Sequence, residues 1–107
     1  MDHSNDVKNY VGSPDAEAIA ALAKNYKLVL SQPDSQWVAF SDPAELERVK
    51  ENYLKGKLGL TDSDDLDGAL DAVKQTMSGT VNKSRLTVYY LLADHFGKLD
   101  VVKAFGS

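Results

Sequence analysis

The sequence contains no cysteine, and several other signatures of catalytic or metal chemistry are also missing. Without cysteine, the chain can form no disulfide, no thiolate nucleophile and no cysteine-based zinc or iron–sulfur site. The two histidines, His3 and His95, have no second histidine or carboxylate at the spacing of a helical zinc motif. Glycine-rich phosphate loops and nucleophile elbows are absent as well. We therefore expect no metal site, no cofactor and no catalytic residue, and we predict that the protein is not an enzyme.

Long apolar stretches are also missing. No apolar run approaches the roughly 18–20 residues that a membrane-spanning helix needs. The N-terminal stretch MDHSNDVKNY is polar and acidic, and it lacks the basic and apolar regions of a signal peptide. We expect a soluble, cytoplasmic protein that does not engage a membrane.

The charge is modest and unevenly placed. The net charge is −4, and residues 61–79 hold five acidic side chains but one basic one, whereas residues 80–107 hold four basic and two acidic ones. This asymmetry is too small to indicate a polyanionic partner. Acidic side chains beside any helix-turn-helix in this region would repel phosphates, so we expect no nucleic-acid binding.

Hydrophobic periodicity indicates helices along most of the chain. No stretch alternates with period two between turn signals, so no strand is predicted. The predicted fold class is all-α, a compact bundle of four main helices and a short C-terminal helix, at residues 14–30, 43–57, 62–78, 83–96 and 98–105. Residues 1–12 carry few large apolar side chains and are expected to form a flexible tail. Residues 13–107 then form a single helical domain.

Local signals indicate where the helices begin and end. Asp42, Pro43 and Glu45 form a capping box, in which Glu45 is expected to reach back to the N–H group of Asp42. The residue types also predict two further caps, Ser13 (with Pro14 at the first helical position) and Asn82, and two glycines that close helices, Gly79 and Gly97.

The stretch 82–98 is predicted to be the central helix. One face carries apolar side chains at helical spacing, and a second set widens this face to most of the girth: Leu86, Tyr89, Tyr90, Ala93 and Phe96, then Val88, Leu91 and Leu92. A helix that is apolar over most of its girth is surrounded by other elements.

The acidic run 62–68 allows two interpretations. Its aspartates suit the start of a helix, where the macrodipole favours negative charge. If Gly68 were the sixth position of a calcium loop, Ser63 would replace the first aspartate and Lys74 the bidentate glutamate. We therefore interpret the run as an acidic helix N-terminus.

Lys83 and Arg85 fall in the first turn of the predicted central helix, where positive charge opposes the macrodipole unless an anion is close. Either a small anionic or phosphorylated ligand binds there, or Arg85 pairs with aspartates of the preceding helix. Pairing needs only local geometry and is favoured, while the anion site is the sharpest hypothesis about a ligand. His95 and Lys98, at the other end of the helix, complete the candidate ligand-binding set. His95 could act as a base only if the fold supplies a partner.

Three large aromatic side chains lie outside the main helical patterns: Trp37, Phe40 and Phe105. Loop aromatics commonly cover the end of a core, and the alternative is an exposed docking patch. This surplus leads to the hypothesis of a non-enzymatic protein-interaction module. A homo-oligomer formed through the alanine-rich helix near residues 16–23 is a further alternative.

Three stretches carry a resemblance to a known family. They are ELERVKENYLKGKLGL (45–60), LDGALDAVKQTM (66–77) and NKSRLTVYYLLADHFGK (82–98). These stretches resemble a small bacterial family catalogued as a domain of unknown function, over about residues 41–105. The resemblance implies a small, cytoplasmic, helical bacterial protein and brings no activity, cofactor or catalytic residue.

Overall fold

The computed structural model describes residues 3–105, which contain seven α-helices and one π-helix. In chain order these are α1 (His3–Lys8), α2 (Ala16–Asn25), α3 (Lys27–Ser31), α4 (Pro43–Arg48), η1 (Val49–Lys55), α5 (Leu66–Thr76), α6 (Arg85–His95) and α7 (Leu99–Lys103). The sole extended pairing within this part of the chain is an isolated antiparallel bridge between Trp37 and Ser84. The predicted all-α fold class is confirmed.

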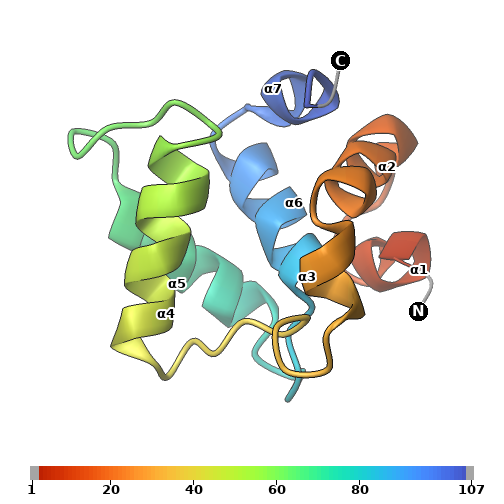
Figure 1. Cartoon of the computed structure of the whole chain (residues 1–107), viewed down its shortest axis with the longest axis horizontal. Helices are drawn as coiled ribbons and strands as arrows, with labels where there is room; N and C mark the ends of the chain where they lie inside the picture. Colours follow the sequence, from red (N-terminus) through yellow and green to blue (C-terminus); the bar gives the residue numbers. More distant parts are fainter. Residues whose placement is uncertain (1–2, 106–107) are drawn as a thin grey trace.

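Helix α6 lies at the centre of the molecule. In Figure 1 it runs between the α4–α5 pair and the group formed by α1, α2 and α3, and it contacts α1, α2, α5 and α7. Every residue from Leu86 to Ala93 is buried, including the polar Thr87. Because apolar side chains cover its whole girth, neighbouring helices can bury area on every side of it. The prediction of a central helix is confirmed.

The two ends of α6 are built differently. At the C-terminal end, Gly97 has a φ of 67° and its N–H donates to Asp94 O at 3.1 Å, while the Lys98 N–H donates to Ala93 O at 2.7 Å. This is a Schellman motif, and Gly97 closes the helix as predicted. At the other end the helix begins after Ser84, so the prediction that Asn82 caps it is wrong. The Arg85 N–H instead donates to Gln36 O at 2.7 Å.

The predicted helix at 14–30 is interrupted in the structure. Asp15 caps α2 in place of the predicted Ser13, accepting from Glu17 N at 3.1 Å and Ala18 N at 3.2 Å. The chain leaves helical geometry at Tyr26, with φ −112° and ψ 21°, and resumes as α3. The ring of Tyr26 packs edge-on against Tyr89 with the centroids 5.0 Å apart. Asn25 and Tyr26 are weak helix formers, so aromatic packing decides the conformation at this point.

The predicted helix at 43–57 is also less regular than expected. Asp42 caps α4 by accepting from Ala44 N at 3.0 Å, with Pro43 in the first turn, as predicted. After Arg48 the α-helix continues as the π-helix η1, where the Gly56 N–H donates to Glu51 O at 3.1 Å, five residues back. A Cβ on Gly56 would lie 2.7 Å from Asn52 O, so glycine is required at this close approach.

Helix α5 begins later than the predicted start at residue 62. Asp65 is its N-cap and accepts from Gly68 N at 2.9 Å, while Asp64 accepts from the Thr61 N–H at 2.9 Å in the preceding loop. The helix ends at Thr76, and Met77 forms its C-cap. Gly79 has no positive φ, so the prediction that it closes this helix is wrong. Aspartates compete for local backbone N–H groups, which favours a capped loop over another helical turn.

The two terminal segments pack against the bundle. The sequence predicts a flexible tail at residues 1–12, but residues 3–8 form α1, and its Val7 is fully buried. The Thr87 hydroxyl donates to the Asp6 carboxylate, which ties α1 to the buried face of α6. Helix α7 is shorter than the predicted 98–105, and its Lys103 Nζ lies 3.0 Å from Asp15 Oδ2 at the start of α2. Val7 and this hydrogen bond help to dock a segment that its composition alone would leave loose, and Tyr10 and Val11 also pack against the core.

Candidate functional site

Arg85, one of the predicted ligand-binding residues, is largely but not fully buried in the structure. Its side chain is 11% exposed, and its Nη2 lies 2.6 Å from Glu45 Oε1 of α4. The expected pairing with aspartates of the preceding helix is wrong, because the partner lies 40 positions away along the chain. Charge-assisted hydrogen bonds of this kind are short and strong.

Glu45 accepts from a second arginine on its own helix. Arg48 Nη2 lies 2.7 Å from Glu45 Oε2, and Arg48 is 61% exposed at its side chain. Burial raises the pKa of the Glu45 carboxyl, but the hydrogen bonds from Arg48 and Arg85 outweigh it and hold the pKa below its ordinary value. The predicted capping box is therefore incomplete: Asp42 caps α4, but Glu45 turns inward to the arginines.

The remaining polar contacts of Arg85 hold the loop that carries Trp37. Arg85 Nε donates to Ser35 O at 2.6 Å, and Nη2 donates to Trp37 O at 3.3 Å. The backbone supports the same junction, since the Val38 N–H donates to Lys83 O at 2.9 Å. Arg85 is thus a clamp that joins α4, α6 and the loop at residues 35–38.

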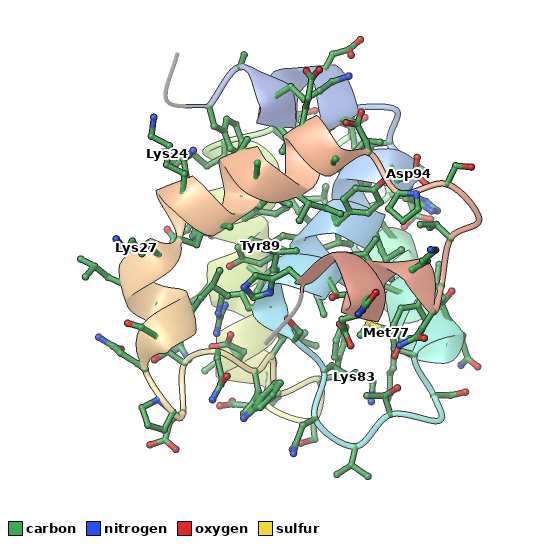
Figure 2. All side chains as sticks on the ribbon, turned by 90° about the vertical axis from the view of Figure 1, so that its right-hand side faces the viewer. Lys24, Lys27, Met77, Lys83, Tyr89 and Asp94 are labelled. Atoms are coloured by element: carbon green, nitrogen blue, oxygen red, sulfur yellow. The ribbon has the colours of Figure 1, made fainter. Side chains whose placement is uncertain are left out.

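Two stacked tyrosines, Tyr89 and Tyr53, support the Arg85 clamp. Arg85 Nη1 donates to the Tyr89 hydroxyl at 3.0 Å, and the guanidinium carbon lies 5.7 Å from the centre of that ring. The Tyr89 and Tyr53 rings stack with centroids 3.9 Å apart, and the Tyr53 hydroxyl donates to Tyr89 O at 2.7 Å. In Figure 2, Tyr89 lies in the interior, behind the helices that carry Lys24 and Lys27. These contacts limit the movement of Arg85 and therefore of the loop it holds.

The clamped loop borders a hollow of about 420 Å³, called here the Trp37 hollow. Its lining includes Trp37 and Phe40 from the loop and Val81 from the segment before α6. Val81 is 93% exposed, whereas Trp37 and Phe40 are half-buried. Phe40 packs on the core, as the core-cover interpretation expects, and it also lines this surface hollow, while a docking role for the loop aromatics stays a prediction.

Two lysines border this hollow. Lys83 precedes α6, and its Nζ donates to Thr80 O at 2.7 Å; Lys74 comes from α5 and forms no ion pair with any residue that the structure describes. One carboxylate, Asp34, also lines the hollow. In Figure 2, Lys83 lies near the start of α6 and Asp94 near its end. The structure therefore places Lys83 beside Trp37 and Phe40, which the sequence assigned to a different hypothesis.

A smaller hollow adjoins the first. It has a volume of about 160 Å³ and shares Phe40 and Lys74 with the Trp37 hollow. We call it the Leu46 hollow, and its remaining lining residues are Leu46, Leu70, Asp67 and Asp71. The two hollows share Phe40 and Lys74 in their walls, and we refer to the two hollows and these shared walls together as the groove.

The other predicted site residues lie elsewhere. His95 is exposed at the end of α6, with its ring centre 5.1 Å from that of Phe96, and Lys98 follows the helix. Phe105 is half-buried against the core, and Lys57 Nζ lies 6.0 Å from its ring centre. His95, Lys98 and Phe105 are all absent from the linings of the two hollows. Their roles in binding stay predictions.

The acidic segment before α5 forms surface ion pairs. Lys50 Nζ lies 3.2 Å from Glu47 and 3.0 Å from Asp67, and Lys55 Nζ lies 2.6 Å from Asp62. Lysine side chains from η1 thus pair with these carboxylates, and together they line a surface hollow of about 330 Å³. Across the described part of the chain, no group of three or more histidines, aspartates or glutamates is arranged to hold a metal ion. Nor does any helix there have the length and apolarity to cross a membrane.

Sequence reasoning missed Glu45, Lys74 and Val81 as members of this region. A cation at the start of a helix opposes the macrodipole and requires a nearby anion, so the sequence did indicate that a carboxylate such as Glu45 lies close. The choice among the carboxylates depends on how α4 packs, and local spacing carries no such information. Val81 gave a weaker signal, as a single apolar residue in a polar turn.

Comparison with known families agrees with the resemblance noted in the sequence. The family described as "Protein of unknown function (DUF2853)" matches residues 2–100, and the chain belongs to this family. The match also covers residues 2–40, which lie outside the stretch 41–105 that carries the resemblance. A search of curated proteins found none that matches the sequence.

Proposed function

We propose that this member of a family of unknown function is a protein-interaction module whose partner docks at the Trp37 hollow. The lining of the hollow includes two aromatic side chains, Trp37 and Phe40, and Val81, which is 93% exposed. Tryptophan and other aromatic residues are enriched where interfaces derive most of their binding energy. An isolated exposed apolar residue is ordinary, whereas one beside an aromatic hollow supports a docking role.

The single observation that carries the proposal is the clamp behind the hollow. Arg85 makes hydrogen bonds to the carbonyl groups of Ser35 and Trp37 and an ion pair with Glu45. A loop held in this way loses little conformational entropy when a partner binds. The buried charges of the clamp are costly to maintain, and a preformed binding surface is a reason to retain them.

A second candidate function is binding of a small anionic or phosphorylated ligand. The favourable observation is that Lys74 and Lys83 border the same hollow, whose volume of about 420 Å³ falls in the range of roughly 300–1,000 Å³ typical of ligand pockets. Arg85 would contribute little, since Glu45, Tyr89 and the loop carbonyls already engage its guanidinium group. Thermal-shift screening with phosphorylated metabolites, repeated on Lys74→Gln, distinguishes this candidate from protein docking.

Affinity capture from the native cells tests the leading proposal. The full chain is compared with Val81→Asp and with a matched control, Leu28→Asp, which changes a 78% exposed leucine outside the hollow. We expect a stoichiometric partner that mass spectrometry finds with the wild type and Leu28→Asp but not with Val81→Asp. Equal recovery with all three proteins, or no stoichiometric partner at all, would contradict docking at this hollow.

Four related expectations stay predictions. They are the absence of enzymatic activity, the cytoplasmic location, the bacterial origin and the alternative of a homo-oligomer. Light scattering over a range of concentrations decides the last of them. A dimer that Val81→Asp dissociates would make a second copy of this chain the partner.

A further inference from the structure

We propose that the partner supplies a short extended segment of acidic character that carries bulky apolar side chains. These apolar anchors enter the Trp37 hollow and the Leu46 hollow, and the carboxylates of the segment face Lys74 and Lys83. This inference rests on the proposed function, because it names the chemistry of the segment that docks.

The shape of the groove favours an extended segment. The two hollows, of about 420 and 160 Å³, are neighbours that have Phe40 and Lys74 in both linings. Each offers apolar groups, with Val81 and Trp37 at one end and Leu46 and Leu70 at the other. In an extended chain every second side chain points to the same side, so two anchors can enter neighbouring hollows.

The charged side chains around the Trp37 hollow favour acidic residues at one end of the docking segment. Lys74 and Lys83 border the Trp37 hollow against one carboxylate, Asp34, on a chain whose net charge is −4. Lys74 has no ion-pair partner in the described part of the chain, and Lys83 is bonded to a neutral carbonyl, Thr80 O. An ammonium group has three donors, so both lysines retain capacity for a carboxylate.

The Leu46 hollow has the opposite character. Asp67 and Asp71 line it, and Lys50 already neutralises Asp67 at 3.0 Å. Acidic residues of the segment therefore belong beside the Trp37 hollow, and the far end of the segment is apolar or neutral. This polarity places the acidic end of the segment at the Trp37 hollow.

A small anion would cover less of this surface than a peptide segment would. Such a ligand would contact the two lysines but would leave Val81, which is 93% exposed, and the whole Leu46 hollow uncovered. A peptide segment satisfies the lysines and buries these apolar groups in one event.

The test uses synthetic peptides with phenylalanine and leucine anchors two positions apart and aspartate or glutamate at one end. Each has a matched analogue in which asparagine or glutamine replaces the acidic residues. Trp37 is the sole tryptophan, so its fluorescence reports binding in the hollow, and the anisotropy of a labelled peptide reports binding independently. We expect the acidic peptides to bind about ten-fold more tightly than their neutral analogues at low salt, and this difference to shrink with added salt.

Variants of the full chain assign the effect to the groove. Lys74→Gln and Lys83→Gln should each weaken the acidic peptide about three-fold, and the double variant about ten-fold, without affecting the neutral analogue. The matched control is Lys24→Gln, which removes an exposed lysine of α2 that projects away from Lys83 in Figure 2. Because Lys83→Gln also loses the bond to Thr80 O, thermal unfolding of each variant is measured alongside, and Lys74→Gln alone keeps the test valid.

Three results would overturn the inference. Equal binding of acidic and neutral peptides would remove the role of charge, while the dependence of partner capture on Val81 would still support the proposed function. Absence of binding by either series at millimolar concentration would exclude a short segment as the partner. Full displacement of the peptide by inorganic phosphate at similar concentration would identify a small anion as the occupant.

Discussion

Two groups of ion pairs involve the α4–η1 segment, and they differ in burial. In the first, Glu45 and Arg85 are each 11% exposed at their side chains. In the second, Lys50 pairs with Glu47 and Asp67, whose side chains are 60% and 83% exposed. The distances are similar, at 2.6 Å for the buried pair and 3.0–3.2 Å for the exposed ones.

Similar distances in the two groups of ion pairs therefore do not imply similar contributions to stability. A buried charge that loses its partner is left without compensation, whereas an exposed charge is rehydrated and screened. The buried pair also determines where the Trp37 loop lies, because Arg85 donates to Ser35 O and Trp37 O. The exposed pairs join η1 to α5 and its preceding loop, and Asp67 is the member of this group that lines the Leu46 hollow.

The largest effect is expected from removing the buried cation. Arg85→Ala leaves the carboxylate of Glu45 with Arg48 alone and releases the Trp37 loop, so the free energy of unfolding should fall by about 3–5 kcal/mol. The matched control is Arg48→Ala, which removes the other, 61% exposed, arginine from the same carboxylate and should cost no more than about 1 kcal/mol. Urea denaturation measures both. Equal losses would show that burial is not the deciding factor.

Removing the charge of Glu45 should have the next largest effect. Glu45→Gln keeps an acceptor near Arg85 but leaves that cation without a counter-charge, and we expect a loss of about 2 kcal/mol at neutral pH. The loss should depend on pH with a definite sign. The pKa of Glu45 in the folded protein lies below its ordinary value of 4.5, so the stabilisation is present above that pH and is lost as pH falls through the folded pKa.

The pH dependence is measured by denaturation of the wild type and Glu45→Gln in parallel. The difference in unfolding free energy should be constant from neutral pH down to about 5 and should then narrow as the solution becomes more acidic. A difference that widens on acidification would contradict the ion pair described here.

The exposed group should respond weakly. Lys50→Gln removes the contacts to Glu47 and Asp67, and the free energy of unfolding should change by less than about 1 kcal/mol. Added salt should abolish even this change, because exposed pairs are screened. A salt-insensitive loss of more than that amount would place Lys50 in the same class as Arg85.

The smallest effect on stability is expected at Val81. This side chain is 93% exposed, so Val81→Asp should change the free energy of unfolding by no more than about 0.5 kcal/mol. The variant therefore separates binding from folding, in contrast to Arg85→Ala. Thermal unfolding of Val81→Asp and Leu28→Asp in one buffer is the check, and a marked loss for Val81→Asp alone would assign it a packing role.

The sequence predicted those parts of the fold that depend on local patterns. The central helix followed from its apolar girth, Asp42 from its place before proline, and Gly97 from the need for a positive φ. Each of these signals acts within a few residues of its position.

The parts that could not be predicted depend on contacts between distant segments. Glu45 fits a capping box locally, but Arg85, 40 positions away, offers a stronger partner in a buried setting. Asp6 and Thr87, 81 positions apart, dock a segment whose composition indicates a loose tail. The Trp37 hollow likewise forms from the loop at 35–41, α5 and the segment before α6. The sequence identified three of its lining residues, Trp37, Phe40 and Lys83, but assigned them to two separate sites.

Amide chemical-shift mapping of the full chain with its captured partner tests the central claim most directly. If the partner docks at the Trp37 hollow, the largest shifts will fall on residues 37–41, Lys74 and residues 81–83, and Val81→Asp will abolish them. Shifts centred on Leu28 in α3, or on His95 and Lys98 beyond the far end of α6, would contradict the account.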